Sequence, residues 1–245
     1  MFCSCKQSGC ARLRFPKWEL IPIDFSWEIT GKLLCLVLTL RVALLENLIA
    51  PFLTRSLERE QLRQLELHLE LLLRWNAKIS LTAIRDRQEI ASRHFGESLF
   101  AGEQLNPADG ARLADLGSGA GFPGLPIAVL FPRLEVILIE SQQKKVAFLR
   151  EALRSLELNN ATVHAGRAEN SGIKAGIVTL RAVEHFETVL PTAAALISPQ
   201  GRLALLIGAG QVKTAIKTLS QLNWNEPIQV PESRQRVLLI GEKDK

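Results

Sequence analysis

The pattern of hydrophobic and polar positions divides the chain into three parts. Residues 1–41 show no sustained period, whereas residues 42–105 show the recurrence every three, four or seven positions that is typical of amphipathic helices. The clearest stripe consists of Leu62, Leu65, Leu69, Leu72 and Ile79. The pattern therefore predicts a helical annex at residues 42–105, preceded by a segment of different character.

A second helix of the annex is predicted from its first residues. Asp86-Arg-Gln-Glu89 resembles a capping box, in which Asp86 caps the helix and Glu89 reaches back. The helix is expected to run to about Leu99, and the proline, aspartate and glycine at 107–110 then form a turn.

Residues 106–245 alternate strand-like and helix-like segments, which is the pattern of an α/β domain with a largely parallel sheet. Helices are predicted at about 123–130, 143–158 and 211–222. The predicted strands are residues 112–116, 135–140, 161–165, 177–183, 202–207, 227–230 and 236–240. The connection between the last two predicted strands is too short for a crossover, so the final strand of these seven is expected to run antiparallel to the others.

Composition and charge narrow the possible classes of protein. With 245 residues, of which 47% are hydrophobic and 22% charged, the chain can bury the core of one sizeable domain plus a small annex. The absence of tyrosine disfavours a surface that binds single strands by aromatic stacking alone. Of the net charge of +5, residues 1–41 contribute +3, so any nucleic-acid contact of the remaining chain requires a local basic patch.

All cysteines lie near the beginning of the chain, which leaves the rest without a disulfide framework or a thiolate metal site. They are Cys3, Cys5, Cys10 and Cys35. The uncharged run Leu33–Leu40 is far shorter than the roughly 20 residues that a membrane-spanning helix needs. We expect a cytoplasmic protein with no membrane span, no export signal and no metal.

The segment richest in chemistry follows the first predicted strand. It reads Asp115-Leu-Gly117-Ser-Gly119-Ala-Gly121, with three glycines at alternate positions after an acidic strand end. Glycine adopts positive φ at little cost and lets a ligand approach the backbone closely. This arrangement predicts a ligand-binding loop.

Two ligands compete for this loop. Gly119-x-Gly121-x-x-Gly124 formally fits the dinucleotide fingerprint, whereas the acidic residue and alternating glycines resemble the first motif of S-adenosylmethionine-dependent methyltransferases. Pro123 and Pro126 remove two of the backbone amides that a pyrophosphate would require. The prolines therefore favour S-adenosylmethionine.

Two carboxylates are candidates to bind this ligand. In a methyltransferase site, Asp115 faces the cationic amino-acid end of the ligand. Glu140, at the end of the second predicted strand, can accept hydrogen bonds from both ribose hydroxyls. Because both candidate ligands contain ribose, Glu140 does not discriminate between them.

Beyond the glycine loop, the chain resembles the glucose-inhibited division protein B family, the bacterial small-subunit ribosomal RNA (guanine-N7) methyltransferases. The stretches that carry the resemblance are Trp75–Thr82, Arg93–Leu99, Asp115–Pro126, Glu140–Arg150, Arg167–Glu169 and Arg181-Ala182. The resemblance covers about residues 43–243. The chain departs from the family at Ser80, Leu180 and Ile207, where Asn, Ser and Lys are usual.

The resemblance implies a Rossmann-like class I S-adenosylmethionine-dependent methyltransferase that methylates N7 of a guanine in 16S ribosomal RNA, guanine 527 in the 530 loop. Carried over by position, Gly117 and Phe122 line the donor pocket, and Ala168 and Glu169 lie beside the adenine. Arg181 closes the site near donor and substrate and positions the target.

This chemistry sets few demands on side chains. Guanine N7 has a lone pair and no proton to lose, so no general base is expected. His94 is accordingly expected to be a packed, hydrogen-bonded residue. His68, His164 and His185 are expected to cluster with nothing, which predicts no metal site.

The partner that the resemblance implies is small-subunit ribosomal RNA or the 30S particle, bound by a monomer. The candidate RNA contacts are Lys78, Arg85, Arg87, Arg93, Lys144, Lys145 and Arg150. Two alternatives stay open: a non-catalytic ribosome-binding or RNA-binding protein that keeps the fold, suggested by Leu180 and Ile207, and a nicotinamide-dependent dehydrogenase, which the prolines disfavour.

A separate hypothesis concerns the origin of residues 1–41. The resemblance begins only around Val42, and a bacterial gene can start at a valine codon, so this segment is predicted not to belong to the natural functional protein. The competing interpretation is an extension that docks on the ribosome through its charge of +3. Under the first hypothesis the segment packs poorly against the rest.

Overall fold

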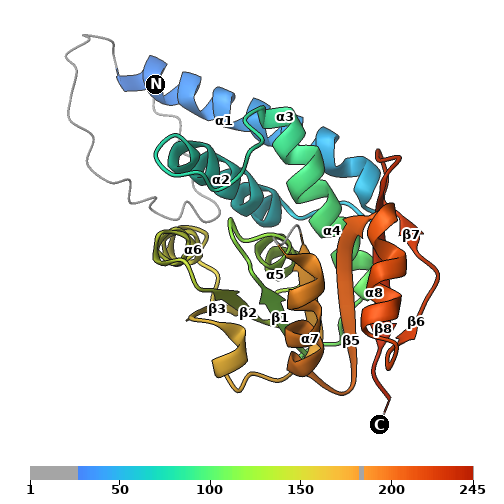
Figure 1. The fold of residues 1–245 in the computed structure, drawn as a ribbon. Helices are drawn as coiled ribbons and strands as arrows, with labels where there is room; N and C mark the ends of the chain where they lie inside the picture. Colours follow the sequence, from blue (N-terminus) through green and yellow to red (C-terminus); the bar gives the residue numbers. More distant parts are fainter. Residues whose placement is uncertain (1–26, 182–184, 245) are drawn as a thin grey trace. The chain divides into compact units, whose positions relative to one another are not determined.

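The computed structural model describes residues 27–181 and 185–244 (Figure 1). The chain divides into two compact units, residues 1–37 and 38–245, and the first contributes only the beginning of one helix to the described part. The hypothesis about residues 1–41 therefore falls mostly outside the described residues, as do Cys3, Cys5 and Cys10. The second unit contains the sheet and all the other described helices.

The annex predicted at residues 42–105 is helical, but its first helix begins already at Trp27, within the segment that was expected to lack a sustained period. Its elements are α1 (Trp27–Ile49), η1 (Ala50–Phe52), α2 (Arg59–Asn76), α3 (Arg87–Ile90), the π-helical turn η2 (Ala91–Gly96) and α4 (Glu97–Leu105). The predicted leucine stripe of α2 is buried at 5% exposure or less, whereas Ile79 lies beyond the end of that helix. Leu45 and Ile49, in the last two turns of α1, are buried in the same hydrophobic core as these α2 leucines.

The helix that starts after Asp86 differs from its prediction in two respects. Asp86 does cap it, accepting a hydrogen bond from the Glu89 backbone N–H at 2.8 Å. The Glu89 carboxylate instead pairs with Arg93 at 2.7 Å, because the side chain one turn further along the helix offers it a cation. The helix also continues through η2 and α4 to Leu105 rather than ending near Leu99.

The sheet of the α/β domain is mixed, and its strands follow the order β3-β2-β1-β4-β5-β8-β6, with β7 paired to β8. Pairings among β1 to β5 are parallel, and β8 runs antiparallel to β5, which confirms the predicted direction of the last strand. The strands are β1 (Arg112–Leu116), β2 (Glu135–Glu140), β3 (Ala161–Ala165), β4 (Ala175–Arg181), β5 (Ile197–Gly208), β6 (Asn223–Trp224), β7 (Ile228–Gln229) and β8 (Arg236–Glu242).

Several predicted boundaries in this domain were wrong. The described sheet has eight strands rather than seven, because Asn223 and Trp224 pair with β8 as a two-residue strand too short to show a period. The strand β5 begins five residues earlier than the predicted 202–207. The fourth strand was predicted at 177–183, but β4 begins at Ala175 and ends at Arg181, and 182–184 lie outside the described residues.

The helices of the domain cover both faces of the sheet (Figure 1). They are α5 (Gly124–Leu130), α6 (Gln143–Ser155), η3 (Ala168–Asn170), α7 (Phe186–Leu196), η4 (Ala209–Gln211) and α8 (Val212–Thr218). The helices α6 and α8 end earlier than predicted, and α7 was missed. Pro191 lies inside α7, and proline normally argues against a helix interior because it lacks the amide donor.

Side chains of each strand alternate between two cores. Leu113 of β1 belongs to the core that β1 and β2 share with α5, α6 and the annex helix α2, whereas the next residue, Ala114, belongs to the core under α7 and α8. The annex therefore packs on one face only. This arrangement places the carboxyl ends of β1, β2 and β4 at one edge of the sheet, which is where α/β proteins bind their ligands.

Candidate active site

The loop after β1 has the backbone that its glycines predict. Gly117, Gly119 and Gly121 have φ values of +71°, +56° and +86°, which side-chain-bearing residues rarely adopt. The loop closes on itself where the Gly121 N–H donates to the Ser118 carbonyl at 2.7 Å. A Cβ added at Gly121 would lie 2.3 Å from a Leu125 methyl carbon, so glycine is required there for space as well.

Asp115 binds the start of α5 and the neighbouring strand β4, and its predicted contact with a ligand stays a prediction. It is fully buried, and its carboxylate accepts hydrogen bonds from the Gly124 N–H at 3.1 Å and from the Thr179 hydroxyl at 2.8 Å. Burial raises the pKa of Asp115 to about 6, although these hydrogen bonds oppose the shift. In this arrangement the carboxylate fixes β1, β4 and the start of α5 to one another.

A cavity of about 360 Å³ opens beside the loop. It is lined by Leu116, Gly117, Ile139, Glu140, Ser141, Gln142, Lys145, Gly166, Arg167, Ala168, Glu169, Val189 and Thr192. Of the predicted donor-binding residues, Gly117, Glu140, Ala168 and Glu169 therefore meet at one cavity. The others, Asp115, Gly119, Gly121, Phe122 and Arg181, do not line it.

Glu140 links the loop that follows β1 to the segment that follows β2. Its two carboxylate oxygens accept hydrogen bonds from the Gly119 N–H at 3.0 Å and from the Gln142 N–H at 2.8 Å. Each carboxylate oxygen has more than one acceptor site, so both keep capacity for a further donor. Glu140 thus holds the glycine loop in place while its carboxylate lines the cavity.

The opposite wall of the cavity is formed by the segment after β3 and by α7. Ala168 begins the short helix η3 and is buried, whereas Glu169 is exposed and accepts a hydrogen bond from the Thr192 hydroxyl at 3.2 Å. Because Thr192 belongs to the helix that sequence reasoning missed, this wall could not be predicted in full.

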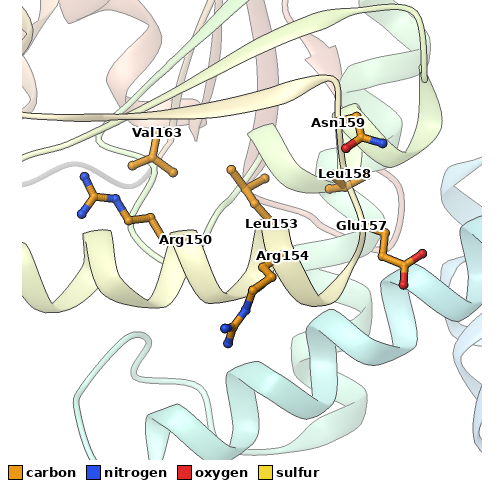
Figure 2. Close-up of a pocket in the computed structure, with 7 residues that line it drawn as sticks. All are labelled: Arg150, Leu153, Arg154, Glu157, Leu158, Asn159 and Val163. Carbon is orange, nitrogen blue, oxygen red and sulfur yellow. The ribbon is translucent and has the colours of Figure 1, made fainter. Parts of the chain in front are cut away.

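A second and larger cavity, of about 650 Å³, lies between α6 and β3 (Figure 2). It is lined by Arg150, Leu153, Arg154, Glu157, Leu158, Asn159 and Val163. Arg150 is the only predicted site residue among them, and no residue of the glycine loop contributes. The smaller cavity at the carboxyl ends of the strands is therefore the candidate active site.

Arg181, at the end of β4, turns toward the annex. Its guanidinium donates to the Arg93 carbonyl at 2.6 Å and to His94 Nδ1 at 2.9 Å, and it pairs with the Glu97 carboxylate at 3.1 Å. Only 4% of its side chain is exposed. Burial lowers the pKa of Arg181 to about 10, which still leaves it charged at neutral pH. Arg181 does not line the cavity, and its role near donor and substrate stays a prediction.

His94 is a packed, hydrogen-bonded residue, as predicted. Because Nδ1 accepts from Arg181, the proton of the neutral ring resides on Nε2, which lies 2.8 Å from the Thr82 hydroxyl oxygen. Burial, followed by the nearby positive charge of Arg181, lowers the pKa of His94 to about 2. The ring is thus neutral at physiological pH and its lone pair is occupied.

His68 corrects another prediction, because it was expected to cluster with nothing. It is fully buried, and its ring stacks on Phe122 with 4.9 Å between centroids. His68 Nε2 lies 2.9 Å from the Ala120 carbonyl oxygen of the glycine loop, and burial lowers the pKa of His68 to about 4. Phe122, which also stacks on His94 at 4.9 Å, therefore packs against the annex instead of lining the cavity.

Asn76 was missed in the sequence and organises the segment that leads into the second annex helix. Its side-chain oxygen accepts from the N–H groups of Leu81 at 2.9 Å and Thr82 at 3.1 Å, and its amide donates to the Thr82 carbonyl at 3.0 Å. Thr82 in turn binds His94. The signal that could have identified it is its place in Trp75–Thr82, one of the stretches that carry the family resemblance.

The predicted RNA-contact residues separate into two groups. Arg87 pairs with Glu66 and Glu70, Arg93 pairs with Glu89, and Arg85 donates to the Asn76 carbonyl at 2.6 Å. These three arginines thus have structural partners. No ion pair within the described part of the chain engages the others, which are Lys78, Lys144, Lys145 and Arg150.

The scaffold around the site has neither a metal-binding group nor a membrane-spanning helix in its described part. Among residues 27–181 and 185–244, no three His, Cys, Asp or Glu side chains gather into a potential metal-binding group. None of the helices in the same described ranges is long and apolar enough to cross a membrane.

The parallel sheet with its antiparallel last strand, the glycine loop after β1 and the carboxylate at the end of β2 define a class I S-adenosylmethionine-dependent methyltransferase fold. Solved structures agree. The tRNA (m1A58) methyltransferase TrmI of Aquifex aeolicus is similar with a TM-score of 0.51 and 17% identity, covering 61% of this chain and 68% of that one. A SAM-dependent O-methyltransferase of Thermotoga maritima has a TM-score of 0.50 and 18% identity, covering 61% and 65%.

The chain belongs to the rRNA small subunit methyltransferase G family, whose profile matches residues 61–235. A ribosomal RNA small subunit methyltransferase G of Bacillus cytotoxicus is 33% identical over 205 residues, covering 78% of this chain and 86% of the relative. One of Streptococcus pneumoniae is 34% identical over 203 residues, covering 77% and 86%. Another, of Xanthomonas axonopodis, is 43% identical over 143 residues, covering 58% and 66%. These matches confirm the family resemblance.

Proposed function

We propose that this protein transfers a methyl group from S-adenosylmethionine to N7 of a guanine in small-subunit ribosomal RNA. The observation that carries the proposal is the cavity formed by Gly117, Glu140 and Ala168 in a chain that belongs to this family. The relatives named above are ribosomal RNA small subunit methyltransferases. Guanine 527 is the target that the resemblance implies. Because bacterial ribosomes are assembled in the cytoplasm, the proposal places the protein there.

The cavity fits the donor in its chemistry. Gly117, with its left-handed backbone and no side chain, leaves room for a ribose beside the loop. Glu140 would accept hydrogen bonds from the ribose hydroxyls, because both of its oxygens keep acceptor capacity. Ala168 and Glu169 would flank the adenine. The cavity also offers apolar side chains at Leu116 and Ile139, which suit the faces of a nucleoside.

Bound S-adenosylmethionine supplies an electrophilic methyl group on a sulfonium centre. The protein's task is then to align guanine N7 with that methyl group, because N7 carries a lone pair and has no proton to lose. The two histidines next to the glycine loop are consistent with a reaction that needs no general base. His94 is neutral with its lone pair occupied by Arg181, and His68 is buried against Ala120, so neither is arranged to remove a proton from a substrate.

We infer the face presented to RNA from the cations that have no ion pair within the part of the chain that the structure describes. Lys145 lines the cavity and Lys144 precedes it at the start of α6, so both lie beside the donor cavity, where they would neutralise a phosphate of bound RNA. Arg167, which is exposed on the opposite wall, is a third candidate that sequence reasoning did not include. Arginine and lysine at such positions neutralise phosphates and contribute affinity without reading the base sequence.

A methylation assay with a matched pair of variants tests the proposal. Small-subunit particles and RNA from a strain lacking the gene are incubated with labelled S-adenosylmethionine, and the modified nucleotide is located by mass spectrometry. Glu140→Gln should lose most activity, whereas Glu135→Gln, at the other end of the same strand and outside the cavity, should retain it. A protein that binds the particles but transfers no methyl group would support the non-catalytic alternative instead.

A further inference from the structure

The annex helix that runs through α3, η2 and α4 is irregular where it contacts Arg181 at the end of β4. In the π turn η2, the Glu97 N–H donates to the carbonyls of Ser92 and His94 instead of the Arg93 carbonyl, which would be its partner in a regular α-helix. The Arg93 carbonyl accepts a hydrogen bond from outside the helix, donated by Arg181 at 2.6 Å. Single π turns are frequent at functional sites, and this one binds an arginine from the end of a strand.

Glu97, the residue directly after the π turn, binds two arginines that come from different strands. Its Oε2 pairs with Arg181 at the end of β4 at 3.1 Å, and its Oε1 pairs with Arg236 at the start of β8 at 2.8 Å. The Glu97 side chain is 5% exposed. One buried carboxylate thus balances two guanidinium groups, and Arg181 is the more deeply buried of the two.

Arg181 is consequently held at three points by one helical segment. Its Nη1 donates to His94 Nδ1, and its Nη2 donates to the Arg93 carbonyl and to Glu97. Among the described residues its Nε has no hydrogen-bond partner, although it is buried. A guanidinium fixed in this way has one orientation, and the carboxylate of Glu97 is the only charged group among its three partners.

The fixed arginine borders the donor loop. Leu180, which precedes it, pairs in register with Leu116, and Leu116 is followed directly by Gly117. The Arg181 guanidinium carbon also lies 6.0 Å from the centroid of the Phe122 ring, at the end of the same loop. The position of Arg181 is therefore linked to the place where donor and target must meet.

We propose that Glu97 is a positioning residue for methyl transfer, which acts by holding Arg181 at the end of β4. The inference rests on the proposed function, because it assigns a residue to the same reaction. Glu97 itself does not line the donor cavity. Its loss should therefore slow the transfer step while donor binding is retained, since Glu140 and the glycine loop keep their own contacts.

The test is a double-mutant cycle with a matched control. Glu97→Gln, Arg181→Lys and the double variant are compared in single-turnover methylation of saturating particles, in donor affinity by calorimetry, and in melting temperature. The control is Glu103→Gln on the same helix, since Glu103 is also mostly buried and hydrogen-bonded, with the N–H and hydroxyl of Thr54. If Glu97→Gln does not fold, Glu97→Asp, which keeps the charge but shortens the reach, takes its place.

Glu97→Gln should slow the single-turnover rate by about tenfold to a hundredfold with donor affinity unchanged within about twofold, as misalignment costs rate rather than binding. Glu103→Gln should keep its rate even if its melting temperature falls equally. The double variant should be no slower than Arg181→Lys alone. A wild-type rate in Glu97→Gln, or losses that multiply in the double variant, would overturn the inference. Absence of methylation by the unaltered protein would refute the proposed function instead.

Discussion

The buried ring of His68 should make the stability of this protein depend on pH in a way that one substitution removes. In the unfolded chain its pKa is the ordinary 6.5, whereas burial lowers the pKa in the folded protein to about 4. Between these two pH values His68 is protonated in the unfolded state and neutral in the folded state. Stability contributed by His68 is therefore fully present above pH 6.5 and is lost progressively as the pH falls to about 4.

The size of the effect follows from the shift of the pKa. Each unit is worth about 1.4 kcal/mol, so the free energy of unfolding should fall by about 3 kcal/mol over the whole range and by about 2 kcal/mol between pH 7.5 and pH 5. Asp115 acts in the opposite direction, because its pKa is raised to about 6, and its contribution is lost as the pH rises through that value. The unaltered protein and a His68 variant share the contribution of Asp115 and of the other titrating groups, so these cancel in the difference between their free energies of unfolding.

His68→Gln is the suitable variant, because glutamine keeps an N–H donor for the Ala120 carbonyl and does not titrate. Urea unfolding, followed by circular dichroism at a series of pH values, gives the free energy of unfolding of both proteins. The difference between them should change by about 2 kcal/mol from pH 7.5 to pH 5. His68→Phe should show the same change with lower stability throughout, since it leaves the carbonyl unpaired. Parallel curves for the unaltered protein and His68→Gln would refute the reasoning.

Three further predictions concern the donor loop, the donor carboxylate and the beginning of the chain. Gly117→Val should fold, with a loss of roughly 1–3 kcal/mol because valine resists a φ of +71°, and should show no donor binding by calorimetry; unchanged affinity would contradict the placement of the cavity. Glu140→Gln should weaken donor affinity by about tenfold to a hundredfold, whereas Glu135→Gln should not; equal affinities would remove Glu140 from the site. Removal of residues 1–41 should leave melting temperature and methylation nearly unchanged, because the hydrophobic cores of the described part contain no residue before Val42 and the exposed Arg41–Glu70 ion pair contributes at most about 1 kcal/mol; loss of activity would favour a functional extension.

The parts of the fold that could be predicted are those encoded by local patterns. The strands β1, β2 and β3 have the predicted bounds. In β1 and β2, most positions are buried, and a short apolar run between turn residues marks such a parallel strand. The positive φ values of the glycine loop follow equally from the residue type. By contrast, α7, which has Pro191 in its interior, and β6, whose two residues show no period, were not predicted.

The contacts that could not be predicted depend on residues far apart in the chain. The hydrogen bond that Asp115 accepts from Thr179 joins two neighbouring strands whose pairing the sequence does not show. The attachment of Arg181 to Glu97 joins positions 84 residues apart, and nothing in their spacing indicates it. His68 was similarly assigned no partner, since its contact with Ala120 depends on how α2 packs against the glycine loop.

The central claim, methylation of a guanine in small-subunit ribosomal RNA, is tested most directly in the cell. Small-subunit RNA from a strain lacking the gene is compared by mass spectrometry with RNA from strains that carry the unaltered gene or the Glu140→Gln variant. One guanine N7 methyl group should be lost on deletion, restored by the unaltered gene and not restored by the variant. An unchanged set of modified nucleotides in the deletion strain would contradict it.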